Sequence, residues 1–136
     1  MALMISTPKA LASEKNYGIA TVSEVTSIYD ADTFRVSING WPPIIGERIS
    51  IRANGFDAPE IRGKCESEKI AARQAKQLTV ELLRGAKVIE LRNMKRGKYF
   101  RIVADVYLDG KPLADIQIRS GLSRPYSGGK RLSWCE

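Results

Sequence analysis

Charged side chains gather in the stretch from Ile51 to Glu60, at the end of a run with β-strand character. Arg52 lies within this run and Asp57 lies at its end. Because Pro59 removes a backbone donor and fixes φ, the strand should end there and Glu60 should begin a loop. Two carboxylates beside a guanidinium suit a site for a hard cation and a phosphate, since such cations take oxygen ligands and arginine matches phosphate oxygens. The same charges also fit an ordinary solvated strand end.

The composition limits which catalytic groups and partners the chain can use. The chain has no histidine, which removes the commonest general acid or base and the usual zinc ligand. Its net charge of +7 points to an acidic partner, either nucleic acid or an anionic surface. One segment has many basic residues and a single acid, Glu90; its basic residues are Arg84, Lys87, Arg92, Lys95, Arg96, Lys98 and Arg101. This clustering favours a binding patch.

The two cysteines, Cys65 and Cys135, are too far apart for a CxxC redox or zinc motif. They could form one disulfide, which would stabilise the fold by about 4 kcal/mol in the chain-entropy model and would imply an oxidising compartment. They could equally be two unrelated free thiols. No stretch approaches the length of a transmembrane helix, so we expect no membrane span.

Alternation and turn signals predict the elements that position the charged residues. We expect strands over residues 18–25, 33–38 and 47–56, with a connection over 27–32. Asp32 then lies just before the second strand. In the third strand Ile49, Ile51 and Ala53 share one face, which places Arg52 on the opposite face.

Helical periodicity begins after the third strand. A helix is predicted over residues 67–84, with an apolar stripe formed by Ala71, Ala75, Leu78 and Leu82. Further strands are expected over 87–93 and 101–108, where Arg101 falls off the core face. A short helix over 112–120 follows, and the chain after Leu122 reads as a loop.

This order predicts an α+β, mainly β fold: a five-stranded oligonucleotide-binding (OB-fold) barrel with a helix between strands three and four and a short C-terminal helix. We expect a single domain over residues 18–136. Residues 1–17 read as an N-terminal tail or the remnant of a signal peptide.

Three phrases carry a family resemblance: YDADTFRV (29–36), IRANGFDAPE (51–60) and GKYFRIVADVYLDGK (97–111). Together they resemble the staphylococcal nuclease-like (thermonuclease) family, and the likeness extends from Gly18 to Tyr126. The resemblance implies calcium-dependent hydrolysis of phosphodiester bonds in DNA and RNA with little sequence preference. Water would attack phosphorus in line and leave 3′-phosphate ends. The implied partners are single-stranded or frayed DNA and RNA, with no membrane.

The resemblance also implies residue roles. Asp32 and Asp57 match the carboxylate ligands of Ca²⁺, and Ala58 matches a position that supplies a main-chain carbonyl, where the family often has threonine. Glu60 matches the proposed general base. Arg52 and Arg101 match the two phosphate-binding arginines.

Three further residues are implied to bind substrate: Lys98, Tyr99 and Tyr126. Tyr99 could instead be a packing residue, as strand aromatics often are. Phe100 stands where the family usually has glycine.

On the implied fold, Cys65 and Cys135 would both lie near the rim of the cleft, which favours a disulfide. We therefore expect a periplasmic or secreted monomer, with a cytoplasmic location as the alternative. The alternative function is a catalytically silent nucleic-acid-binding OB-fold module. Such degenerate domains usually lack the carboxylates or arginines that this chain retains.

Overall fold

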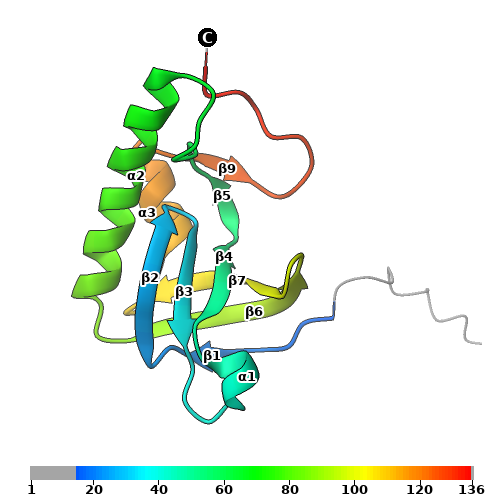
Figure 1. Cartoon of the computed structure of the whole chain (residues 1–136). Helices are drawn as coiled ribbons and strands as arrows, with labels where there is room; N and C mark the ends of the chain where they lie inside the picture. The colour runs from blue at the N-terminus through cyan, green and yellow to red at the C-terminus, as the bar shows by residue number, and fades with distance from the viewer. Residues whose placement is uncertain (1–14, 136) are drawn as a thin grey trace, which may run out of the picture.

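The described chain folds into a curled seven-stranded sheet and a small two-stranded sheet, with helices packed against them (Figure 1). The computed structural model describes residues 15–135, so most of the expected N-terminal tail or signal-peptide remnant lies outside the described residues. The elements, in chain order, are β1 (Ala20–Thr21), β2 (Glu24–Asp30), β3 (Thr33–Ser37), α1 (Pro43–Gly46), β4 (Ile49–Ala53), β5 (Gly55–Asp57), α2 (Glu66–Gly85), β6 (Ile89–Gly97), β7 (Arg101–Leu108), β8 (Lys111–Pro112), α3 (Leu113–Arg119) and β9 (Arg124–Tyr126).

The main sheet has the strand order β1-β6-β7-β4-β3-β2, with β8 paired to β7. Its pairs are antiparallel except for β4 and β7, which run parallel. β1 and β2 are consecutive in the chain and separated by Val22 and Ser23 alone. Both ends of the sheet therefore meet in one segment, and the sheet curls into a barrel. This confirms the predicted mainly β, OB-like architecture with a helix between the third and fourth long strands.

The predicted boundary of the first strand is wrong. β2 continues to Asp30, where a connection was expected from residue 27. The β2–β3 turn is consequently tight and consists of Ala31 and Asp32. The predicted third strand, 47–56, is divided into β4 and β5 at Asn54. The short elements α1, β8 and β9 were not predicted. β9 pairs with β5 and adds a strand where the sequence reads as a loop.

The barrel interior is filled by the apolar faces of the alternating strands. Phe34, Ile51 and Leu91 are fully buried, whereas Arg52 lies on the other face of β4, as predicted. Each large aliphatic or aromatic side chain buried in this way stabilises the fold by about 1.5–3 kcal/mol. The core thus makes the sheet a rigid support for the residues at its edge.

Helix α2 packs against β2 (Figure 1), but its buried stripe is rotated by one residue from the predicted one. It consists of Glu68, Ala72, Ala75, Thr79 and Leu83. Two of these are polar, which hides the stripe from a search for apolar periodicity. The Thr79 hydroxyl donates to the Ala31 carbonyl at 2.8 Å and accepts from Gln117 Nε2 of α3 at 2.8 Å. These bonds attach the β2–β3 turn to α2 directly and to α3 through Thr79.

Candidate metal and phosphate site

Asp32 lies in the β2–β3 turn and is buried. The turn is attached to α2 through the carbonyl of the preceding residue, Ala31. The Asp32 carboxylate accepts a hydrogen bond from the Thr33 hydroxyl at 3.1 Å and from the Ala58 N–H at 3.4 Å. Asp32 is therefore held from two directions, one of them a distant segment of chain.

Asp57 ends β5, and its side chain is only 3% exposed. Pairing of β5 with β9 continues to Asp57, and Pro59 then ends the strand, as the sequence predicts. Ala58 is buried between Asp57 and Pro59. Because the Ala58 N–H bonds to Asp32, the turn after β2 and the end of β5 lie together.

Arg52 projects from β4 toward the same point. Its Nη1 lies 3.2 Å from Asp32 Oδ2. The same guanidinium donates to the carbonyl of Ala53 and, at 3.2 Å, to that of Phe56. Hydrogen bonds to main chain on both sides fix the side chain in one orientation, so Arg52 is preorganised.

Asp30 is a buried carboxyl beside Asp32 that the sequence reading missed. Its Oδ1 accepts from the Asp32 N–H at 3.3 Å. Burial, together with the charge of Asp32, raises the pKa of Asp30 from 3.8 to about 8. Burial and the neighbouring charge therefore favour the protonated form of Asp30. The Asp-Ala-Asp spacing was visible in the sequence, but it does not show that both carboxyls point inward.

Glu60 begins the exposed loop that follows Pro59. The backbone of this loop is organised by Glu68 of α2, another residue the sequence reading missed. The Glu68 carboxylate accepts from the N–H of Glu60 at 3.2 Å and from that of Lys64 at 2.9 Å. A Cβ at Gly63 would lie 2.6 Å from Glu68 Cγ, so glycine is needed for this close approach.

Arg101 begins β7 on the strand beside Arg52. In the parallel β4–β7 pair, Arg101 aligns with Ser50 and Val103 aligns with Arg52. The two arginines therefore lie on the same face of the sheet, two residues apart along the strands. Within the described residues, the buried Nε of Arg101 has no hydrogen-bond partner. An unpartnered buried donor fits an anion-binding role.

The three expected substrate-binding residues lie in the β6–β7 hairpin and on β9. Lys98 and Tyr99 occupy the tip of the β6–β7 hairpin, where Tyr99 is 93% exposed and is not a packing residue. The Tyr126 hydroxyl donates to the Gly129 carbonyl at 2.6 Å. Among residues 15–135, none of the three hydrogen-bonds to Asp32, Asp57 or Glu60. At the same tip Phe100 has φ +56°, which explains why glycine suits this position.

The segment after β9 contributes two residues that the sequence reading missed. Arg131 bonds to Asp57 Oδ1 through Nε at 2.7 Å, and its other nitrogens contact Glu60 and, at 3.3 Å, the Ala58 carbonyl. Trp134 Nε1 donates to Asp57 Oδ2 at 3.3 Å. Partial burial lowers the pKa of Arg131, but hydrogen bonds and charge from Asp57 and Glu60 outweigh this and raise it above its ordinary value.

The cysteines form the disulfide favoured by the resemblance. Cys65, just before α2, is bonded to Cys135, with Cα atoms 6.1 Å apart. The bond joins the loop that carries Glu60 to the end of the described chain. It weakly fits an extracellular location. No helix among the described residues is long and apolar enough to cross a membrane.

The oxygen donors of Asp32, Asp57 and the Ala58 carbonyl have the chemistry that Ca²⁺ prefers. Two are carboxylates, and the hydrogen bond from the Ala58 N–H to Asp32 places the Asp57–Ala58 segment beside the Asp32 carboxylate. The donor set therefore fits a hard divalent cation.

The fold and this constellation define an OB-like barrel with a carboxylate and arginine site at its edge. The family model of the staphylococcal nuclease homologue matches residues 50–131, more than half of the chain. The chain belongs to this family. A search of curated proteins found no match. The matched range contains Arg52, Asp57, Glu60 and Arg101, whereas Asp32 precedes it.

Proposed function

We propose that the protein is a calcium-dependent nuclease that hydrolyses DNA and RNA with little sequence preference and leaves 3′-phosphate ends. The observation that carries this proposal is the direct linkage of Asp32 to both Arg52 and the Asp57–Ala58 segment. Oxygen ligands for a cation and a donor for phosphate thus occur in one cluster. The net charge of +7 supports nucleic acid as the substrate.

In the proposed mechanism, Asp32, Asp57 and the Ala58 carbonyl would hold the ion. Bound Ca²⁺ would supply polarisation of the phosphate and orientation of water. Glu60, which is exposed at the loop, accepts the proton from the attacking water, a role worth typically about 10²–10⁴-fold. Arg52 and Arg101 bind phosphoryl oxygens from neighbouring strands and stabilise the charge that develops on them.

Three residues outside the carboxylate cluster would guide the nucleic-acid strand to the site. Lys98 and Tyr99 at the hairpin tip would contact a single or frayed strand, with Tyr99 offering a stacking face. Tyr126 would line the other side. The disulfide supports a periplasmic or secreted location, and we propose a monomer.

One observation favours the alternative, a catalytically silent nucleic-acid-binding module. Arg131 engages Asp57, the Ala58 carbonyl and Glu60 together, which are groups that the enzyme would need for metal and water. A protein that kept these contacts permanently would bind nucleic acid without cleaving it.

Incubation with single-stranded DNA and RNA, in Ca²⁺ or in a calcium chelator, distinguishes the two functions. The nuclease should cleave in Ca²⁺ alone and yield 3′-phosphate ends, detected by resistance of the products to 3′ extension until they are dephosphorylated. Glu60→Gln should lower kcat at least about 10²-fold. Glu47→Gln, which removes an equivalent exposed charge next to α1, is the matched control. Binding without cleavage in Ca²⁺ would instead establish the binding module.

A further inference from the structure

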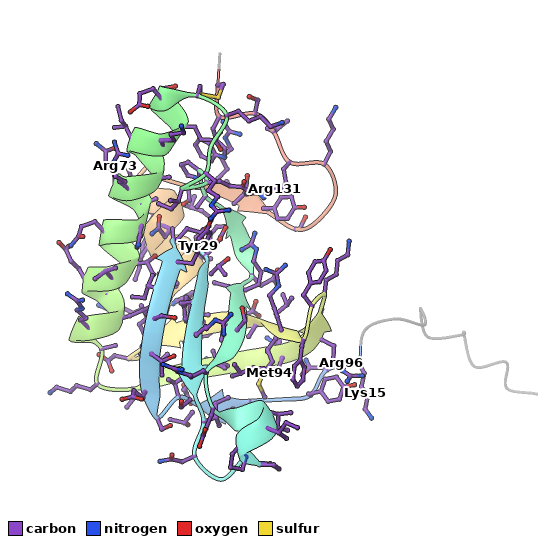
Figure 2. All side chains as sticks on the ribbon, in the orientation of Figure 1. Lys15, Tyr29, Arg73, Met94, Arg96 and Arg131 are labelled. Carbon is purple, nitrogen blue, oxygen red and sulfur yellow. A yellow bond between two sulfur atoms is a disulfide. The ribbon has the colours of Figure 1, made fainter. Side chains whose placement is uncertain are left out.

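The C-terminal strap, residues 127–135, returns from β9 toward the start of α2, where the Cys65–Cys135 disulfide attaches it (Figure 1). Figure 2 shows Arg131 of this strap beside β5, the strand that ends at Asp57. The strap has no regular secondary structure. Its position is set by side-chain contacts and the disulfide.

The contacts of Arg131 are those a cation would make. Its guanidinium bonds to the Asp57 carboxylate, the Ala58 carbonyl and the Glu60 carboxylate. The first two are proposed metal ligands and the third is the proposed base. A bound divalent ion and the Arg131 guanidinium therefore need the same oxygen atoms, and they exclude one another on steric and electrostatic grounds.

Trp134 reinforces this arrangement from the same strap. Its ring lies under the Arg124 guanidinium, 3.7 Å from the charge centre, and its Nε1 donates to Asp57 Oδ2. Arg124 also donates to the Ser133 carbonyl at 2.9 Å. Both oxygens of Asp57 are thus engaged by the strap.

The disulfide determines how strongly Arg131 competes. Cys135 is four residues after Arg131 and is bonded to the loop that also carries Glu60. β9 already holds the start of the strap, and the disulfide fixes its other end, so the range of positions open to Arg131 shrinks and its effective concentration at the site rises. A dithiol would reduce the Cys65–Cys135 bond by transferring two electrons and two protons. The two cysteines then become thiols, and the dithiol is oxidised to a cyclic disulfide.

We propose that Arg131 is an internal competitor of the divalent cation at Asp57 and Ala58, and that the Cys65–Cys135 disulfide holds it there. Reduction then raises the affinity of the site for the cation. The inference rests on the proposed metal ligands and concerns the regulation of that same site. It also explains how a nuclease can contain the Arg131 contacts without being permanently silent.

Calorimetric titration of Ca²⁺ into the full-length protein, without nucleic acid, tests the inference. Arg131→Gln should bind Ca²⁺ at least about tenfold more tightly than the oxidised wild type. Lys130→Gln is the matched control, because it removes one positive charge from the adjacent, exposed position of the strap. It should change the dissociation constant less than threefold. Reduction by a dithiol should tighten binding to the wild type and leave Arg131→Gln unchanged.

The outcomes separate this inference from the proposed function. Equal or weaker Ca²⁺ binding by Arg131→Gln would overturn the competition, even if the wild type cleaves DNA in Ca²⁺. Tighter binding by Arg131→Gln without cleavage would support the competition and contradict the nuclease. Absence of Ca²⁺ binding in every variant would reject both. If circular dichroism shows that Arg131→Gln is unfolded, Arg131→Lys replaces it: its point charge cannot make the paired contacts, so it should also bind Ca²⁺ more tightly.

Discussion

Arg52 and Arg131 both form ion pairs with a carboxylate of the candidate site, yet the chain holds them in different ways. Arg52 lies on β4, is 17% exposed, and is fixed by two main-chain carbonyls in addition to Asp32. Arg131 lies on an irregular strap and is 40% exposed. The sheet fixes the first, whereas a disulfide and side-chain contacts restrain the second. Two arginines with similar partners can therefore have opposite roles, one permanent and one releasable.

The largest expected loss of activity comes from substituting Arg52, the arginine fixed on the sheet. Arg52→Gln should lower kcat/KM for single-stranded DNA by at least about 10³-fold, because it removes a preorganised donor to phosphate and leaves Asp32 without its ion-pair partner. Steady-state cleavage assays in Ca²⁺ measure this loss. Arg131→Gln should not lower kcat/KM in the same assay. Equal losses in the two variants would contradict the distinction between the arginines.

The disulfide should matter for global stability as well as for the strap. Closing a loop with a sequence separation of 70 residues contributes about 4 kcal/mol in the chain-entropy model. Urea unfolding with and without a dithiol should show a loss of this size, and the Cys65→Ser/Cys135→Ser variant should match the reduced protein. A loss below about 1 kcal/mol would mean that the strap is held without the bond.

Glu68 supports the loop that carries Glu60, through hydrogen bonds from the loop's backbone. Glu68→Gln retains the shape but weakens the acceptor for the N–H groups of Glu60 and Lys64, so the unfolding free energy should fall by about 1–2 kcal/mol. The kcat should fall while KM stays nearly constant, because Glu60 would lose its position. Glu66→Gln, exposed in the same helical turn, serves as the control. An unchanged kcat in Glu68→Gln would show that the loop holds Glu60 independently.

A smaller effect should come from Asp30, on the Arg52 side of the site. Its folded pKa of about 8 exceeds the ordinary 3.8, so the folded state binds more protons than the unfolded state between these values. Its stabilising contribution is therefore complete below about pH 4 and is lost as pH rises through about 8. The free energy of unfolding of Asp30→Asn, relative to that of the wild type, should rise by at least about 1 kcal/mol from pH 5 to pH 8. Urea unfolding at both values, in a calcium chelator, measures this change, and a parallel pH dependence in the two proteins would contradict it.

The regular part of the fold was accessible from the sequence because local patterns determine it. The alternation from Arg101 to Leu108 matches β7 residue for residue, and the helical pattern ends where α2 ends, near Gly85. The rotated stripe of α2 was not accessible. Thr79 and Glu68 are buried because they bond to distant main chain, and polar residues do not appear in an apolar period.

Some residues of the candidate site could be predicted from the sequence and others could not. The family phrases indicated Asp32, Arg52 and Asp57, which the structure brings together. Arg131 and Trp134 lie in a stretch without periodicity, and they reach Asp57 across separations of 74 and 77 residues. Contacts of this kind depend on how the loop closes after β9. The cysteine pair was the one sequence signal that the end of the chain returns to the site.

The division of the first strand into β1 and β2 also affects how the protein behaves among its own copies. Residues 17–22 cover the outer edge of β6 through bonds between Tyr17 and Met94 and between Val22 and Ile89, while α2 packs beside β2. An exposed strand edge is a template for pairing with another molecule. Removing the chain up to Val22 would uncover the β6 edge, and the truncated protein would then tend to associate edge to edge.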